Sequence, residues 1–188
     1  MGLKRFRQRT LEAVVRQHLP VEEDEETTAL LARCRAARRR GYLTQGLFVR
    51  ACRWKSARAI KHVRANTRHR VRAATSAALA ARGDASRLEP LLDLKGVSVP
   101  TASAVLALLD PRRYGVIDIR VWQVLHAFGA VRENRKGTSL SVAQWLQFLS
   151  VLRPVASRLG VTVREVELSL FNAHKAKQDG RLYGGRNG

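Results

Sequence analysis

The sequence predicts an all-α fold. Apolar residues recur at the spacing of a helix face along most of the chain, and residues that start or stop helices bound these stretches. The chain has 188 residues and shows no low-complexity linker or internal repeat. We therefore expect a single compact helical domain over residues 1–178. Residues 179–188 contain several Gly and Arg residues and are expected to form a disordered basic tail.

Each predicted helix has a boundary signal of its own. In the first half the predicted helices are residues 27–39 stopped by Gly41, a helix capped by Thr44, a helix from Ser56 to His62, and residues 67–81 ended by Gly83. In the second half they are residues 86–94, residues 101–109, a helix from Asp118 to about Phe128 ended by Gly129, a long helix from Ser141, and residues 163–175 behind a capping box of Thr162 and Glu165.

A helix, a tight hairpin and a second helix are predicted over residues 86–109. The first apolar period ends before Gly96, which breaks the helix, and the second resumes just after Pro100. In such a hairpin several backbone N–H groups lack an internal partner beside a helix N-terminus, which favours an anion such as a phosphate. Lys95 would add a positive charge at this place.

An isolated acid, Asp118, lies in an otherwise apolar stretch of the segment 114–128. One explanation is that its carboxylate caps the helix that begins near Ile119. The other is catalysis, and the two explanations are compatible. Glu165 and Glu167 are instead interpreted as a helix cap and as a surface or salt-bridge residue.

These two segments carry a family resemblance. LKGVSVPTASAVL followed by YGVIDIRVW resembles the hairpin and the aspartate-bearing segment of the helix-hairpin-helix base-excision DNA glycosylases, whose pattern is roughly L-P-G-V-G-x-x-T-A and then V-D-x-x-V. The matching residues are Leu94, Gly96, Val97, Thr101 and Ala102 in the first part and Asp118 and Val121 in the second. Lys95 stands where the family usually has Pro, and Ser98 stands where it has a second Gly.

The resemblance implies a two-lobed helical domain of the HhH-GPD type and a monofunctional DNA glycosylase. Members that also cleave the DNA backbone carry a nucleophilic Lys two positions after the second Gly, but Pro100 occupies that position here and cannot form a Schiff base. Asp118 would then be the catalytic carboxylate, stabilising the oxocarbenium-like sugar or orienting water. The lesion stays open, and an alkylated purine is a natural choice because its positive charge makes it a good leaving group.

A glycosylase must flip the damaged nucleotide out of the duplex and hold its base against aromatic or apolar walls. The candidates are Tyr42, Trp54, Tyr114 and Trp122. Each of these aromatic residues also fits a place in the hydrophobic core, so the sequence leaves the choice open.

The charge of the chain independently favours a nucleic-acid partner. It has 35 Lys and Arg against 15 Asp and Glu, a formal net charge of +20. From Arg33 to Arg72 there are fourteen basic residues and no acid, which an arginine-rich background does not explain. We expect double-stranded DNA as the partner, and the DNA-binding residues are predicted to be Arg53, Lys55, Arg58, Lys95, Gly96, Val97, Ser98 and Thr101.

Other partners and cofactors receive less support. No apolar run approaches the roughly 18 residues that span a bilayer, so no membrane partner is expected. Cys34 and Cys52 lack metal-site spacing, which argues against zinc or an iron–sulfur cluster. We expect no metal and no cofactor beyond, at most, a monovalent cation at the hairpin. A monomer in the cytoplasm or nucleoid, or in the nucleus of a eukaryote, is expected.

Two alternatives stay open at this stage. The first is a non-catalytic helix-hairpin-helix protein that binds DNA lesions, junctions or ends, in which Asp118 only caps its helix. The second is a basic protein that binds RNA or the ribosome, since folded RNA is a polyanion as well.

Overall fold

The computed structural model describes residues 6–178, and ten α-helices lie within this range. The predicted all-α class is confirmed. The predicted tail, residues 179–188, lies outside the described residues. The helices are α1 (Leu11–Gln17), α2 (Glu25–Arg40), α3 (Gln45–Lys55), α4 (Ile60–Arg64), α5 (Arg68–Ala80), α6 (Asp84–Leu92), α7 (Val99–Leu109), α8 (Ile119–Ala127), α9 (Val142–Leu159) and α10 (Val163–Lys177).

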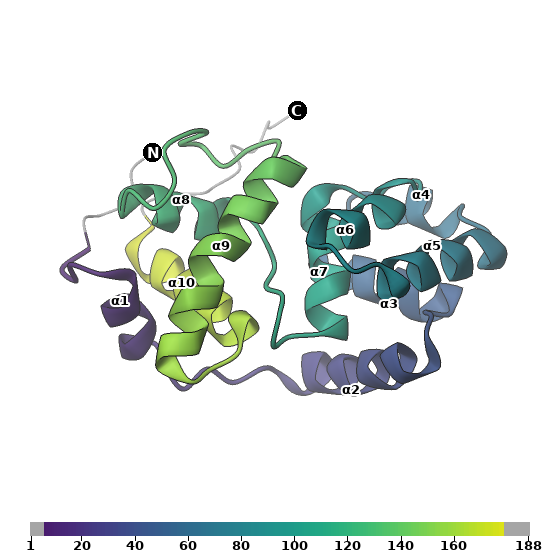
Figure 1. Ribbon diagram of the computed structural model, residues 1–188, viewed down its shortest axis with the longest axis horizontal. Coiled ribbons are helices and arrows are strands. Elements are labelled where there is room, and N and C mark those ends of the chain that lie inside the picture. Colours follow the sequence, from purple (N-terminus) through teal and green to yellow (C-terminus); the bar gives the residue numbers. More distant parts are fainter. Residues whose placement is uncertain (1–5, 179–188) are drawn as a thin grey trace, which may run out of the picture.

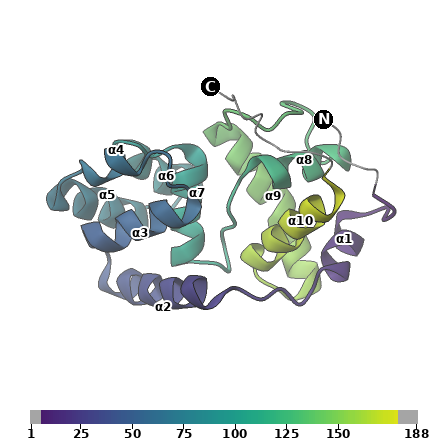
Figure 2. The same ribbon diagram turned by 180° about the vertical axis from the view of Figure 1, so that it is seen from behind.

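The helices gather in two groups that meet along α9 (Figure 1). In one group α3 contacts α2, α4, α5 and α7, and α6 contacts α5 and α7. In the other group α10 contacts α1, α8 and α9. Helix α9 also contacts α6 and α7, and residues 110–118 connect the end of α7 to the start of α8 between the two groups (Figure 2). The residue that begins α8 is therefore placed at the junction of the two groups.

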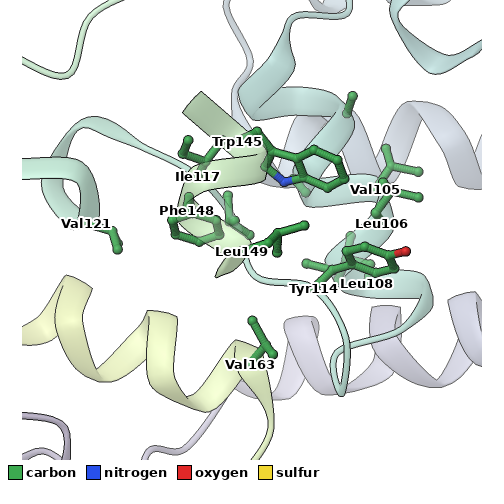
Figure 3. Packing of buried hydrophobic residues seen from close by; sticks show 14 of the residues in the cluster. Val105, Leu106, Leu108, Tyr114, Ile117, Val121, Trp145, Phe148, Leu149 and Val163 are labelled. Atoms are coloured by element: carbon green, nitrogen blue, oxygen red, sulfur yellow. The ribbon is translucent and has the colours of Figure 1, made fainter. Parts of the chain in front are cut away.

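Aromatic packing fills the junction between the groups. Tyr114 stacks on Trp145 of α9, with ring centroids 5.9 Å apart and an interplanar angle of 16°. Figure 3 shows these rings beside Leu106 and Phe148, and all four side chains are buried. The Tyr114 hydroxyl donates to Asp84 at the start of α6, at 2.9 Å. Burial of this much aromatic and aliphatic surface anchors the segment that leads to α8.

Most predicted boundary signals are confirmed. Thr44 and Thr67 cap α3 and α5, and Thr162 with Glu165 forms the expected capping box of α10. The prediction for Ser56 was wrong. Ser56 is the C-cap of α3, whereas Ala59 precedes α4 without any side-chain cap, because the four residues 56–59 separate the two helices.

The two hairpin helices begin earlier than predicted. Helix α6 starts at Asp84 behind Gly83, and α7 starts at Val99 instead of Thr101. The reason is that Pro100 occupies the first turn of α7, where the missing N–H of proline removes no helix hydrogen bond.

Candidate functional site

Residues 93–98 connect α6 and α7 in a tight hairpin. Gly96 has φ +77°, a left-handed conformation that favours glycine. A Cβ at this position would also lie 2.9 Å from the Cβ of His62 and 3.0 Å from the carbonyl oxygen of Ala59. Ser98 has φ −104° and is the N-cap of α7, so this position needs no second glycine. Glycine is required only at position 96, where the hairpin packs against α4.

A buried asparagine holds the hairpin in place. The side-chain amide of Asn66 donates to the carbonyl oxygen of Lys95 and accepts from the N–H of Lys95, both at 2.9 Å. The same amide donates to the carbonyl oxygen of Val63 at 2.9 Å, and Asn66 is only 1% exposed. The hairpin is thus bonded to the end of α4 through one side chain.

The hairpin presents several free backbone donors. Among residues 6–178, the N–H groups of Gly96, Ser98, Val99 and Thr101 have no hydrogen-bond acceptor. They lie at the N-terminus of α7, whose first turn contains no acid. The side chain of Lys95 is exposed beside them. Free N–H groups, the helix dipole and a lysine together favour binding of a phosphate.

Asp118 has two roles, one for each carboxylate oxygen. Its Oδ1 accepts from the N–H of Val121 at 3.0 Å and caps α8, as predicted. Its Oδ2 lies 3.4 Å from Nζ of Lys55 at the end of α3. The side chain of Asp118 is 16% exposed and that of Lys55 is 19% exposed. This ion pair joins the two helix groups and is partly open to solvent.

Asp118 and the hairpin line the same pocket, which we call the hairpin pocket and which has a volume of about 690 Å³. The hairpin and the start of α7 line this pocket, and residues 137–140 line it as well. The predicted site residues that line it are Lys55, Arg58, Gly96, Val97, Ser98, Thr101 and Asp118. Lys95 is an exposed hairpin residue that does not line the pocket, and Arg53 lies on another surface.

A second, smaller pocket of about 340 Å³ also adjoins the ion pair, and we call it the Trp54 pocket. Lys55 and Asp118 line both pockets. The Trp54 pocket is further lined by Trp54, Val116, Arg164, Glu167, Leu168 and Phe171. The ion pair of Lys55 and Asp118 is therefore shared by the hairpin pocket and by a pocket with aromatic walls.

Of the four predicted aromatic residues, only Trp54 lines a pocket beside Asp118. Its indole N–H donates to the hydroxyl of Thr27 at 2.9 Å, and the guanidinium of Arg164 lies 5.2 Å from its ring centroid. Phe171, which the sequence analysis missed, contributes a second aromatic side chain. Phe171 falls on the same face of α10 as Glu167, one turn away, but nothing in the sequence pairs that face with Asp118.

The other three aromatic residues lie elsewhere. Trp122 is fully buried and its indole N–H donates to the carbonyl oxygen of Asn134 at 2.9 Å. Tyr114 is a core residue at the junction of the helix groups. Tyr42 packs against two guanidinium groups and lines neither pocket near Asp118. Trp122 and Tyr114 are buried, and the structure brings none of these three rings to a pocket beside Asp118.

A buried acid lies behind the Trp54 pocket. Glu167 is 2% exposed, accepts from the N–H of Val116 at 3.2 Å, and forms an ion pair with Arg164. Burial raises the pKa of the Glu167 carboxyl; Arg164 opposes this shift and the charge of Asp118 adds to it. Burial alone would lower the pKa of Arg164, but Glu167 and Glu23 raise it. Glu167 is thus a salt-bridge residue, as expected, although it is not on the surface.

Within residues 6–178, no group of three or more His, Cys, Asp or Glu side chains is arranged to hold a metal ion. None of the described helices is both long enough and apolar enough to cross a membrane. No family model matches the chain, and no curated protein or solved structure matches it either.

Proposed function

We propose that the protein is a monofunctional DNA glycosylase with a two-lobed fold of the HhH-GPD type. In this proposal the hairpin between α6 and α7 grips the backbone of the damaged strand. Asp118 then assists hydrolysis of the N-glycosidic bond of a flipped nucleotide, which leaves an abasic site. The proposed partner is double-stranded DNA.

The observation that carries the proposal is that the hairpin and Asp118 line one pocket. The free N–H groups of the hairpin favour a phosphate, and a carboxylate is present in the same 690 Å³ space. Lys55 and Arg58 add positive charge to its wall. The free N–H groups of the hairpin lie 17 to 22 positions before Asp118 in the sequence, and Lys55 lies 63 positions before it. Capping of α8 by Asp118 does not by itself require these residues to line one pocket.

The chemistry follows from the two oxygens of Asp118. Oδ1 is held by the N–H of Val121, which fixes the orientation of the carboxylate. Among residues 6–178, Oδ2 is paired only with Lys55, at 3.4 Å. A DNA phosphate bound at the hairpin would compete for the ammonium group of Lys55. The carboxylate charge would then be available to the sugar as it gains oxocarbenium character.

The proposed site for the flipped base is the Trp54 pocket. Trp54 and Phe171 supply aromatic walls of the kind that receive an extruded base, and the pocket directly adjoins Asp118. Its volume of about 340 Å³ falls in the range of small-molecule sites.

A second candidate function has its own supporting observation. Capping of α8 and the ion pair with Lys55 together occupy both oxygens of Asp118, which is a sufficient structural role for this residue. The alternative is therefore a non-catalytic helix-hairpin-helix protein that binds DNA lesions, junctions or ends.

The deciding experiment compares wild type with Asp118→Asn on duplexes that carry alkylated, deaminated or oxidised bases, followed by alkali to reveal abasic sites. Asparagine caps helices as well as aspartate does, so the variant keeps α8 and loses only the charge. The matched control is Asp24→Asn, because Asp24 likewise caps a helix, α2, through the N–H of Thr27 and lines neither pocket.

For a glycosylase, wild type and the Asp24→Asn control release a base from at least one lesion, and Asp118→Asn loses this activity while it keeps duplex affinity. Tight binding by all three proteins without base release from any lesion would favour the non-catalytic alternative. Equal base release by wild type and Asp118→Asn would remove Asp118 from the mechanism.

A further inference from the structure

A second basic surface lies on the outer side of α2, α3 and α4, away from the hairpin pocket. Two adjoining hollows of about 390 and 440 Å³ mark it, and they share Gly46 and Arg50. The arginines that line these hollows are Arg33, Arg40, Arg50, Arg53 and Arg64, and we call this set the arginine face. Helix α3 lies between α2 and α4 in both ribbon views, so the arginine face crosses three helices (Figure 1, Figure 2).

The arginine face is separate from the hairpin pocket. None of the residues that line its two hollows lines the hairpin pocket. The positions of Arg53 and Lys55 on α3 explain this separation, because the side chains of residues two positions apart on a helix point about 200° apart. Arg50 and Arg53 are three positions apart and share a side of α3, whereas Lys55 turns toward Asp118.

The charge of this face is uncompensated. All five arginines are exposed, and no acid lines either hollow. Among residues 6–178, Arg33, Arg50, Arg53 and Arg64 form no ion pair, in contrast to Arg38 of α2, which pairs with Asp110 at 2.9 Å. Like charges brought together repel each other, so this arrangement is costly unless a polyanion compensates it.

We propose that the arginine face binds the phosphate backbone of duplex DNA outside the nucleotides held at the hairpin pocket. Guanidinium groups suit this partner because their fixed forks match phosphate oxygens. The absence of an acid from the two hollows removes any repulsion of phosphate. The inference rests on DNA being the ligand, but it requires no chemistry at Asp118.

The test measures binding of undamaged duplex DNA by fluorescence anisotropy over a range of salt concentrations. Arg50→Gln/Arg53→Gln should weaken binding and should reduce the slope of log K against log salt by about 0.9 for each phosphate that the variant no longer neutralises. The matched control, Arg82→Gln/Arg112→Gln, removes the same charge from two exposed positions that line neither the hollows nor the hairpin pocket, and should leave the slope nearly unchanged. Arg33→Gln/Arg64→Gln, from the flanking helices, should repeat the effect of the first variant.

Identical salt slopes for the arginine-face variants and the control would overturn the inference. A folded RNA that competes for the arginine face more strongly than duplex DNA would overturn it as well, in favour of an RNA partner. Because undamaged duplex needs no base release, this test can fail while Asp118→Asn still abolishes glycosylase activity, and the reverse can also occur.

Discussion

The side chain of Asn66 forms two hydrogen bonds with the backbone of Lys95, one to its carbonyl oxygen and one from its N–H, each of 2.9 Å. The buried amide thus forms the same two hydrogen bonds with the backbone of one residue that a neighbouring β-strand would form. It connects the end of α4, which follows the basic helix α3, to the hairpin that lines the pocket. The position of the free N–H groups of the hairpin therefore depends on a buried side chain that does not line the pocket.

Replacement of Asn66 by alanine should loosen the hairpin. Asn66→Ala removes the bonds to Lys95 and Val63 and leaves part-buried backbone groups without partners, which costs about 1–3 kcal/mol of unfolding free energy. Urea unfolding gives this value, and duplex binding should weaken as well. Asn172→Ala on α10 is the control and should have little effect on either. Wild-type duplex affinity in a destabilised Asn66→Ala protein would show that hairpin placement does not govern binding.

Gly96→Ala should cost more stability than an alanine at other left-handed glycines. At Gly96 the positive φ is combined with contacts of 2.9 and 3.0 Å from the new Cβ, so strain of about 1 kcal/mol adds to an overpacking cost of about 1–3 kcal/mol. Gly129→Ala is the matched control, since Gly129 has φ +68° but open space around a Cβ. Urea unfolding of both variants separates the two costs. Equal losses would mean that α4 shifts to accept the methyl group.

Removal of Arg164 should destabilise the protein in a pH-dependent way. Arg164→Met leaves Glu167 buried without its cation, which costs about 3–5 kcal/mol at neutral pH. The pKa of Glu167 is raised above its ordinary 4.5 by burial, so stability falls as pH rises through the interval between the unfolded and folded pKa values. Because Arg164 lowers the pKa of Glu167 in the folded protein, Arg164→Met raises that pKa and widens the interval between the unfolded and folded pKa values. Its deficit relative to wild type should therefore shrink as the pH is lowered toward 4.5.

Urea midpoints across this pH range test the effect of Arg164. Arg158→Met is the control, because Arg158 pairs with Glu12 on the surface and such pairs contribute at most about 1 kcal/mol. A deficit of Arg164→Met that is the same at every pH would indicate weaker packing on Trp54 instead of an unpaired carboxylate.

The two cysteines should resist thiol reagents in the folded protein. Burial raises the pKa of Cys34 and of Cys52 to about 12, and each residue is 1% exposed. Reactivity requires the thiolate, so neither thiol should be modified at mildly alkaline pH until denaturant unfolds the chain. Time-resolved labelling followed by mass spectrometry measures both sites. Fast labelling of Cys52 without labelling of Cys34 would show that the wall of the hairpin pocket that contains Cys52 opens in solution.

Features determined by nearby residues were predictable from the sequence. The capping box of Thr162 and Glu165 and the cap formed by Asp118 involve partners three positions away, so a local pattern is enough. The ion pair of Lys55 and Asp118 joins residues 63 positions apart, and no local pattern specifies it. On the basis of charge alone, Arg53 and Lys55 were predicted to belong to the same DNA-binding site. The helical geometry of α3 directs their side chains to different surfaces.

Aromatic residues were the least predictable part of the site. Trp54, Trp122 and Tyr114 each lie within two positions of an apolar residue in the sequence, but only tertiary packing decides which ring is covered. Trp122 and Tyr114 are closed in by other helices, whereas the ring of Trp54 reaches the edge of a pocket formed by α10. The role of Asn66 was unpredictable for a related reason, since it depends on a hairpin 29 positions further along the chain.

The stacking of Tyr114 on Trp145 and the ion pair of Asp84 with Arg153 bear on how the chain reaches its native state. Each of these contacts takes one partner from the α6–α8 segment and the other from α9. A polypeptide cut before α9 would expose Tyr114 to water and leave Asp84 without its main cation. The two groups of helices are therefore expected to melt in one cooperative transition, and limited proteolysis should yield no stable half.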